Sequence, residues 1–195
     1  GAKIDITGVS VHPGSSKNAM ENALLIAIEI NAQLPADAIP ARTEGYEGFF
    51  HLESLRGDTA AAHMGYILRD HDQEKFQEKK RLLEQAVQTV QKAHPKASIR
   101  LELKDSYYNM ASQLKDCMHL IENARRAAEM AGLTAAIHPI RGGTDGARLS
   151  YQGLPCPNLG TGGFNFHGPY ECISVEGMDS AVAVLRNIVA LYAGA

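Results

Sequence analysis

The order of strand-like and helix-like patterns in the first 105 residues constrains the fold more than any other feature of this sequence. Apolar side chains recur at helical spacing in two stretches, residues 16–33 and 73–93. Four further segments have strand character: residues 3–9, 45–55, 60–68 and 98–104. The resulting β-α-β-β-α-β order predicts a ferredoxin-like domain, in which a four-stranded sheet carries two helices on one face.

The helix predicted over residues 73–93 has the clearest limits. Asp70 and Asp72 are both suitable N-cap residues, and the pair His94-Pro95 ends the helical pattern. The apolar side chains of this helix form one stripe: Phe76, Leu83, Val87 and Val90.

Residues 106–195 follow a different pattern. Helices are expected over residues 116–130, 145–152 and 178–192, but only residues 135–140 and 154–159 resemble strands. A sheet of two short strands is not stable by itself in water. We therefore expect this part to complete a larger α/β sheet whose other strands lie outside this sequence.

The composition is that of an ordinary globular protein. Of the 195 residues, 45% are apolar and 21% are charged, and the net charge of −3 argues against a nucleic-acid partner. The longest apolar helical stretch, residues 23–30, is too short to cross a membrane and contains Glu29. Cys117, Cys156 and Cys172 form an odd, widely spaced set that is typical of reduced thiols. We expect a cytoplasmic protein.

The segment Arg141-Gly142-Gly143-Thr144-Asp145-Gly146-Ala147 is the most informative motif. It follows a predicted strand and precedes a predicted helix, so its glycines can let backbone N–H groups approach an anionic ligand. Arg141 adds a planar fork that suits a carboxylate. The alternative is a tight strand–helix turn with a solvated arginine, and the pattern alone leaves both open.

A second motif is the glycine- and aromatic-rich segment that spans residues 160–171. It contains His167, and a neutral imidazole in such a loop is a good zinc ligand that Glu171 can orient. The alternative is a surface histidine that is hydrogen-bonded to backbone. No second ligand lies at a standard spacing, so this motif alone is a weak metal signal.

Two shorter motifs lie in the predicted ferredoxin-like domain. His12-Pro13-Gly14 follows the first strand, and a loop histidine can donate to an oxyanion. Arg69-Asp70 ends the third strand. From the residues alone, the favoured interpretation of His12 is a histidine held in a turn. The favoured interpretation of Arg69-Asp70 is a strand-end ion pair or a helix cap.

In this order, the motifs resemble those of the peptidase T family of tripeptide aminopeptidases, within the superfamily of two-zinc exopeptidases. The resemblance spans essentially the whole chain, and the tyrosine pair at 107–108 and the run at 141–146 are specific to this branch. The matching stretches are residues 11–14, 43–49, 67–70, 105–110, 139–146, 153–159 and 167–168.

The resemblance implies a division into two parts. Residues 1–105 correspond to a ferredoxin-like lid and dimerisation domain, and residues 106–195 to the C-terminal segment of an α/β catalytic domain. The N-terminal part of that domain, which supplies most ligands of the two zinc ions and a glutamate general base, is expected to be absent. The start at Gly1, without an initiator methionine, fits the expectation of an excised piece.

Roles for individual residues also follow from the resemblance. His167 corresponds to the last zinc ligand, and Arg141 to the residue that holds the carboxylate of the peptide. Arg69 is expected near the substrate, and His12 is expected to help stabilise the oxyanion, if necessary across a dimer. Asn158, Gly162 and Gly163 are expected to line the pocket.

The expected activity is zinc-dependent release of the N-terminal residue from tripeptides, with this chain alone inactive. Its expected partners are small peptides, the absent N-terminal catalytic segment and a second copy bound through the lid. The alternative is a non-catalytic dimerisation or binding module built on a ferredoxin-like sheet. RNA binding by such a sheet is disfavoured by the net charge of −3.

Overall fold

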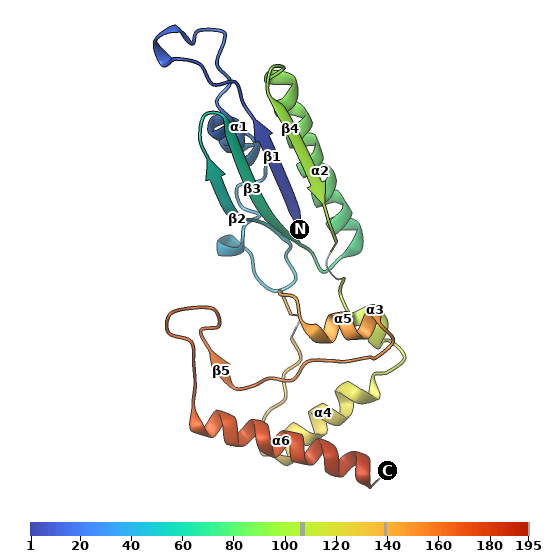
Figure 1. Ribbon diagram of the computed structural model, residues 1–195. Coiled ribbons are helices and arrows are strands. Elements are labelled where there is room, and N and C mark those ends of the chain that lie inside the picture. Colours follow the sequence, from blue (N-terminus) through green and yellow to red (C-terminus); the bar gives the residue numbers. More distant parts are fainter. Residues whose placement is uncertain (106–107, 139, 195) are drawn as a thin grey trace. The chain divides into compact units, whose positions relative to one another are not determined.

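The computed structural model describes residues 1–105, 108–138 and 140–194 (Figure 1). Ser106, Tyr107 and Pro139, which belong to two of the matching motifs, lie outside the described residues. The chain divides into two compact units, Gly1–Ser106 and Tyr107–Ala195, called the first and second unit below. Among the helices described, none is long and apolar enough to cross a membrane.

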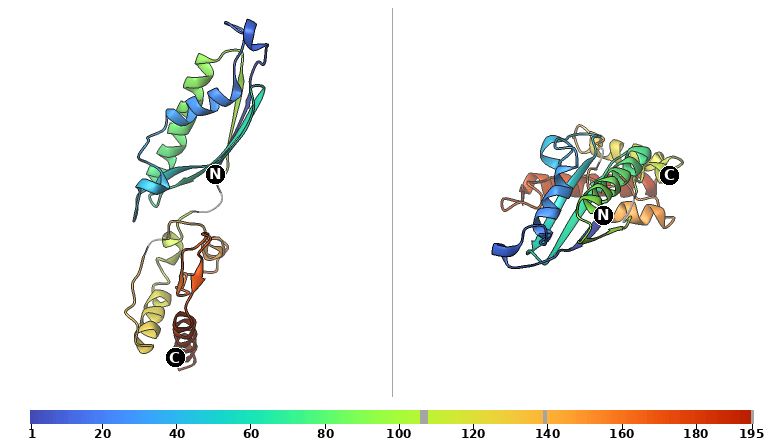
Figure 2. Two further views of the ribbon diagram at one scale, coloured as in Figure 1. Left: turned by 90° about the vertical axis from the view of Figure 1, so that its left-hand side faces the viewer. Right: turned by 90° about the horizontal axis from the view of Figure 1, so that it is seen from above.

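The first unit has the predicted ferredoxin-like fold. Its four strands form one antiparallel sheet in the order β2-β3-β1-β4, and both long helices cover the same face (Figure 2). The elements, in chain order, are β1 (Ala2–Thr7), α1 (Ala23–Ala32), β2 (Phe49–Gly57), β3 (Ala61–Arg69), α2 (Gln73–Ala93) and β4 (Ser98–Leu103).

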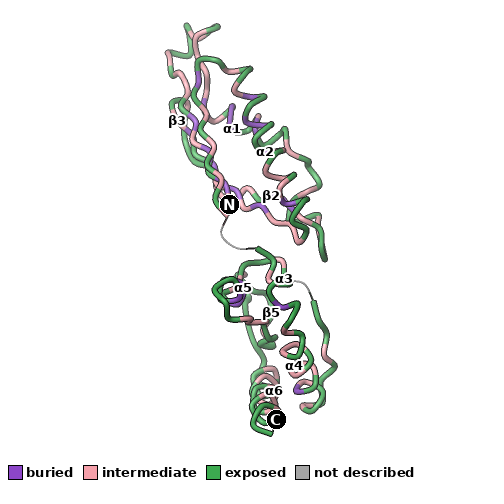
Figure 3. Tube along the Cα trace, turned by 90° about the vertical axis from the view of Figure 1, so that its right-hand side faces the viewer, coloured by how far each residue is buried: buried purple, intermediate pink, exposed green. Residues whose placement is uncertain are grey.

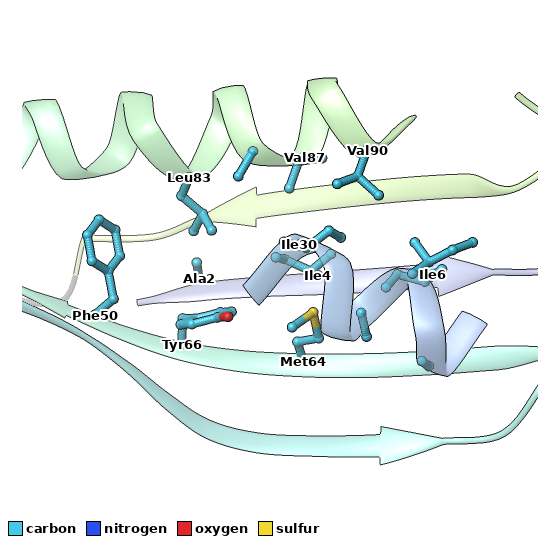
Figure 4. Close-up of a cluster of buried hydrophobic side chains, with 14 of the residues drawn as sticks. Ala2, Ile4, Ile6, Ile30, Phe50, Met64, Tyr66, Leu83, Val87 and Val90 are labelled. Carbon is cyan, nitrogen blue, oxygen red and sulfur yellow. The ribbon is translucent and has the colours of Figure 1, made fainter. Parts of the chain in front are cut away.

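The core of this unit lies between the sheet and the two helices (Figure 4). Alternate residues of β1, Ile4 and Ile6, are almost fully buried, whereas Asp5 between them lies on the opposite face of the sheet. Leu83 and Val90 of α2 are also fully buried, as the predicted stripe requires. Each such side chain contributes about 1.5–3 kcal/mol to stability through burial.

The helix limits depend on capping residues. α2 covers the predicted span, and Asp72 rather than Asp70 caps it, because its carboxylate accepts from the N–H groups of Glu74 and Lys75. The prediction that the first helix begins near residue 16 was wrong. Asn22 caps α1 by accepting from Leu24 and Leu25, and a loop with a 3-10 turn precedes it.

In the second unit, helices are the main regular elements. They are α3 (Ala111–Leu114), α4 (His119–Met130), α5 (Asp145–Tyr151) and α6 (Val175–Ala193), and they accompany the short antiparallel strands β5 (Gly163–Phe164) and β6 (Cys172–Ile173). The strands predicted over 135–140 and 154–159 are not formed among the described residues. A strand needs a partner for its backbone groups, and Pro155 and Pro157 also lack N–H donors.

Helix α6 has an apolar stripe that the described residues leave exposed. Figure 3 shows the exposed residues of this helix in green. On its other side it packs against α4, where the Asn187 side chain donates to the carbonyl of the buried Ala127 at 3.0 Å. The stripe recurs every three or four residues, and each side chain in it is at least 44% exposed: Val175, Met178, Val182, Leu185, Val189 and Tyr192. Contiguous apolar surface of this kind marks an interaction site.

Candidate functional site

His12 lies on a loop whose two ends are hydrogen-bonded to each other. The backbone groups of Val9 and Glu21 pair in both directions, at 2.8 and 3.0 Å. This closes an excursion that follows β1 and contains the 3-10 turn Pro13–Ser15. The His12 ring is exposed, and its Nδ1 accepts from the N–H of Gly14 at 3.1 Å. The loop leaves β1 at its C-terminal end (Figure 1) and carries the exposed His12.

Glu21 also ties this loop to the connection between α2 and β4. Its two carboxylate oxygens accept from the backbone N–H groups of Lys96 and Ala97, at 3.3 and 3.1 Å. His94 Nδ1 lies 3.5 Å from the same carboxylate, and Lys96 Nζ donates to the carbonyl of Asn18. Sequence reasoning missed Glu21, because nothing in the local pattern relates it to residues 75 positions away.

Arg69 is half-buried and ends β3, at the opposite end of the sheet from His12. The next residue, Asp70, forms an ion pair with Lys79 at 2.9 Å, and its side chain is only 3% exposed. A Cβ at Gly48 would lie 2.1 Å from the Asp70 carboxylate and 2.5 Å from the Arg69 carbonyl oxygen. The motifs at 43–49 and 67–70 therefore pack against each other, and glycine is required at their contact.

The face of the sheet opposite the helices carries a charged row that sequence reasoning also missed. Register places Arg56, His63, Asp5 and Arg100 side by side on β2, β3, β1 and β4. His63 Nδ1 lies 2.8 Å from one Asp5 oxygen, and Arg100 donates to the other at 2.9 Å. The hydrogen bond with His63, followed by that with Arg100, lowers the pKa of Asp5 below its ordinary value. The sequence shows which strand positions are polar. It does not show which of them lie side by side, because that depends on the register between the strands.

In the second unit, the structure brings the segment after Arg141 together with Asn158. Thr144 caps α5 by accepting from the N–H of Ala147 at 3.2 Å, and Asn158 Nδ2 donates to the same oxygen at 3.2 Å. A Cβ at Gly146 would lie 2.4 Å from the carbonyl oxygen of Cys156. The glycine thus allows residues 156–158 to approach the start of α5 and its capping residue Thr144, which lies three residues after the half-buried Arg141.

Buried Ser150 holds the same two segments together. Its hydroxyl donates to the carbonyl of Gly146 at 2.7 Å and accepts from the N–H of Cys156 at 3.0 Å. The predicted helix at 145–152 is confirmed. Its first turn holds Asn158 at Thr144, three residues after Arg141 in the sequence.

His167 lies in the loop that joins β5 to β6, and it is exposed. Its backbone φ of 65° is unusual for a residue other than glycine, and Asn165 adopts a similar φ of 56°. Glu171 accepts from the backbone N–H of His167 at 2.9 Å. The Glu171 carboxylate therefore orders the backbone of the loop. This hydrogen bond does not orient the His167 imidazole, which was the role expected for Glu171.

Gly162 and Gly163 lie where this hairpin meets α6. Gly162 has a φ of 80°, and a Cβ there would lie 3.0 Å from the Cα of Gly177. A Cβ at Gly163 would lie 2.9 Å from the ring of Phe166. Close packing accounts for both glycines, and their position as pocket walls stays a prediction. Among the described residues, no group of three or more His, Cys, Asp or Glu side chains is arranged to hold a metal ion.

Comparison with known proteins gives matches along the whole chain. Residues 1–95 match the peptidase dimerisation domain, M20_dimer. Peptidase T of Halothermothrix orenii is 52% identical over 98% of this chain, and that of Alkaliphilus oremlandii is 50% identical over 98%. Each match covers 47% of the relative, so the chain spans about half the length of these relatives.

Two solved structures share the fold. An aminopeptidase PepT from Bacillus cereus superposes with a TM-score of 0.67, at 22% identity, over 96% of this chain and 52% of that one. A tripeptidase from Staphylococcus aureus superposes with a TM-score of 0.76, at 18% identity, over all of this chain and 51% of that one. At these identities the likeness concerns the fold.

Proposed function

Residues 1–95 belong to the M20 peptidase dimerisation domain family, and from this premise we propose that the chain is the lid and C-terminal catalytic segment of a tripeptide aminopeptidase. The proposed reaction is metal-dependent release of the N-terminal residue, and by itself the chain is inactive. The observation that carries this proposal is the 52% identity to a peptidase T, which continues through both units.

The uncovered stripe of α6 supports the proposal that a further segment completes the second unit. Val182, Leu185 and Val189 are each more than half exposed, although a helix with such a stripe normally buries it. The strands described in this unit, β5 and β6, are only two residues long each, too short for a sheet that the helix could cover. The half of the relatives outside the match is long enough to provide one.

The Arg141–Asn158 cluster is the proposed binding site for the C-terminal carboxylate of the peptide. A guanidinium can bind a carboxylate through two parallel hydrogen bonds, and this selects substrates that have a free C-terminus. The hydrogen bond between Asn158 and Thr144 fixes the segment beside the arginine. Gly162 and Gly163 would line the same pocket through their backbone.

His167 is proposed as one metal ligand, at the tip of the β5–β6 hairpin. In the described part of the chain, no group of three or more His, Cys, Asp or Glu side chains is arranged to hold a metal ion. The other ligands would come from the segment outside this sequence. The three free cysteines support a reducing compartment, and we propose a cytoplasmic enzyme.

His12 and Arg69 lie at opposite ends of the first unit's sheet. The six residues of β1 separate the two ends of the sheet by about 17–20 Å. A fully extended tripeptide spans only about 11 Å. We therefore propose that His12 and Arg69 of one chain act on different substrate molecules, and that His12 reaches the substrate bound by a second copy.

The surface proposed for this homodimer combines α1 with the edge strand β2. Helix α1 is apolar on nearly all sides, so Leu25 and Ile28 remain 62% and 54% exposed after Ile26 and Ile30 are buried. Helix α1 contacts β2, which lies at one edge of the sheet. A sheet edge next to apolar surface is suited to pairing with another copy.

A non-catalytic dimerisation module is the second candidate. It is favoured by the continuous buried core that the first unit forms from its own residues. The two candidates differ in what the second unit does. Only the peptidase proposal requires that Arg141, Asn158 and His167 affect turnover of a substrate.

A chimera tests the proposal. This chain replaces the matching half of Halothermothrix orenii peptidase T, to which it is 52% identical. Release of the N-terminal residue from tripeptides by the chimera, and its loss in His167→Ala, support the proposed function. A folded chimera that binds metal but hydrolyses no tripeptide contradicts it and leaves the module interpretation.

A further inference from the structure

We propose that the backbone N–H of Gly14 holds His12 in the tautomer that carries its proton on Nε2, so that the ring presents an N–H donor to the substrate oxyanion. The functional part of this inference rests on the role of His12 in the proposed peptidase. Gly14 is then a positioning residue that acts through the imidazole, and it does not itself touch the substrate.

The hydrogen bond between Gly14 and His12 determines the tautomer. Gly14 donates its N–H to His12 Nδ1 at 3.1 Å, so Nδ1 must offer a lone pair. In a neutral imidazole the proton then resides on Nε2. A proton on Nδ1 would face the Gly14 hydrogen and break this bond.

The two residues after His12 explain why this bond forms. Pro13 occupies the first position of the 3-10 turn and has no N–H, so the first donor that follows His12 belongs to Gly14. A Cβ at Gly14 would lie 3.2 Å from both Nδ1 and Cε1 of the ring, which is tighter than most real contacts. Glycine therefore gives the imidazole room to lie against the turn.

The turn itself is fixed by its own hydrogen bonds. The N–H of Ser15 donates to the carbonyl of His12 at 3.0 Å, and the Ser16 hydroxyl donates to the carbonyl of Pro13 at 2.9 Å. Since the His12 side chain is exposed, these local bonds orient the ring without help from a packed core. A donor that is already oriented stabilises a developing oxyanion without reorganisation during the reaction.

The consequence for catalysis can be separated from binding. An oxyanion donor acts mainly on the transition state, so its loss lowers kcat more than it raises KM. Loss of the Gly14 bond leaves the imidazole present but free to rotate and to change tautomer. We expect a decrease in kcat on the order of 10-fold, smaller than that caused by removal of the ring.

Nuclear magnetic resonance of the full 15N-labelled chain tests the tautomer directly. The expected result is a scalar coupling across the hydrogen bond between the Gly14 amide nitrogen and His12 Nδ1, together with the nitrogen shifts of an Nε2-protonated ring. His12→Gln assigns the ring signals by their disappearance. A folded chain that lacks the coupling, or whose neutral His12 carries its proton on Nδ1, overturns the inference.

Three variants separate the bond from general damage to the loop. Gly14→Pro removes the donor and should abolish the coupling. Gly14→Ala retains the donor but places a Cβ against the ring, and it should weaken the coupling while the rest of the amide spectrum is unchanged. Ser16→Ala is the matched control, since it removes a bond of the same turn that does not involve the ring. It should leave the coupling intact.

Kinetics of the chimera then distinguish this inference from the proposed function. If the coupling is present and His12→Ala leaves kcat unchanged, the tautomer is correct and the proposed role of His12 is wrong. If His12→Ala lowers kcat but Gly14→Pro does not, the function stands and the positioning role of Gly14 fails. Both are supported if Gly14→Pro lowers kcat about 10-fold and adds no further loss to His12→Ala.

Discussion

Asn158 donates from Nδ2 to Oγ1 of Thr144, at 3.2 Å, and so joins a segment after α5 to the residue that begins α5. The same Thr144 oxygen accepts from the N–H of Ala147. Asn158 is thereby held near the motif that starts with Arg141. The proposed substrate site of the second unit depends on this connection.

Asn158→Ala should therefore affect substrate binding more than folding. The lost hydrogen bond is exposed, so we expect about 1 kcal/mol of destabilisation. In the chimera, KM for a tripeptide should rise about 5–10-fold, which corresponds to about 1–1.4 kcal/mol. Gln152→Ala, an exposed position at the end of α5, is the control. Equal KM values for the two variants would remove Asn158 from the site.

Arg141→Lys should weaken recognition of the peptide carboxylate. A lysine keeps the positive charge but cannot form the two parallel hydrogen bonds of a guanidinium. We expect KM for a tripeptide to rise on the order of 10–100-fold, with little change for the same peptide with an amidated C-terminus. Steady-state kinetics with the two peptides measure this. Arg148→Lys, on the exposed face of α5, should change neither value.

Leu25→Asp combined with Ile28→Asp should prevent dimer formation. The carboxylates would place unpaired charges on the apolar face that α1 exposes. Light scattering after size-exclusion chromatography should give the dimer mass for the unmodified chain and the monomer mass for the double variant. Gln88→Asp, on the exposed side of α2, should remain dimeric. A double variant that stays dimeric shows that another surface pairs the copies.

Glu21→Ala should loosen the loop that carries His12. The side chain is 12% exposed and accepts two backbone N–H groups, so we expect a loss of about 1–3 kcal/mol in the free energy of unfolding. Amide exchange of Lys96 and Ala97 should become faster in the native state. Glu84→Ala, at an exposed site on α2, is the matched control. Unchanged exchange at residues 96–97 would show that Glu21 does not hold the loop.

The raised pKa of Tyr66 predicts that the protein loses stability at high pH. Burial raises the pKa of the Tyr66 hydroxyl from 10.0 to about 12, and the hydroxyl donates to Asn31 at 2.8 Å. Between these two values the unfolded chain loses the proton while the native chain keeps it, so stability falls as pH rises through this range. The contribution lost is up to about 3 kcal/mol.

Urea titrations at about pH 9 and about pH 12 measure this effect. Tyr66→Phe should be less stable than the unmodified chain at the lower pH, because Asn31 loses its donor. It should also lose less stability between the two pH values. An identical pH dependence in both proteins would show that Tyr66 does not contribute.

The first unit could be predicted from sequence because its core residues follow the periods of strands and helices. Ile4 and Ile6 alternate with polar neighbours, and Leu83, Val87 and Val90 recur at helical spacing. The start of α1 could not be predicted in the same way. Ala19 and Met20 continue the apolar pattern, but Glu21 pairs with the distant Val9, which the local pattern does not reveal. Asn22 then begins the helix through a local cap on Leu24 and Leu25.

The second unit was harder to predict because, in the part of the chain that the structure describes, the strand patterns at 135–140 and 154–159 have no partner strand. Residues 154–159 are apolar enough for a strand, but the contacts they make are with α5, through Cys156 and Asn158. For the candidate site, residue chemistry indicated Arg141 and His167. The link between Asn158 and Thr144 and the backbone bond of Glu171 depend on loop geometry that spacing does not reveal.

Hydrolysis of a tripeptide by three preparations tests the central claim most directly: this chain alone, the chimera with Halothermothrix orenii peptidase T, and the chimera treated with a metal chelator. The predicted result is no turnover by the chain alone, release of the N-terminal residue by the chimera, and loss of that activity on chelation. Turnover by the isolated chain, or a folded chimera that is inactive with added zinc, would contradict the account.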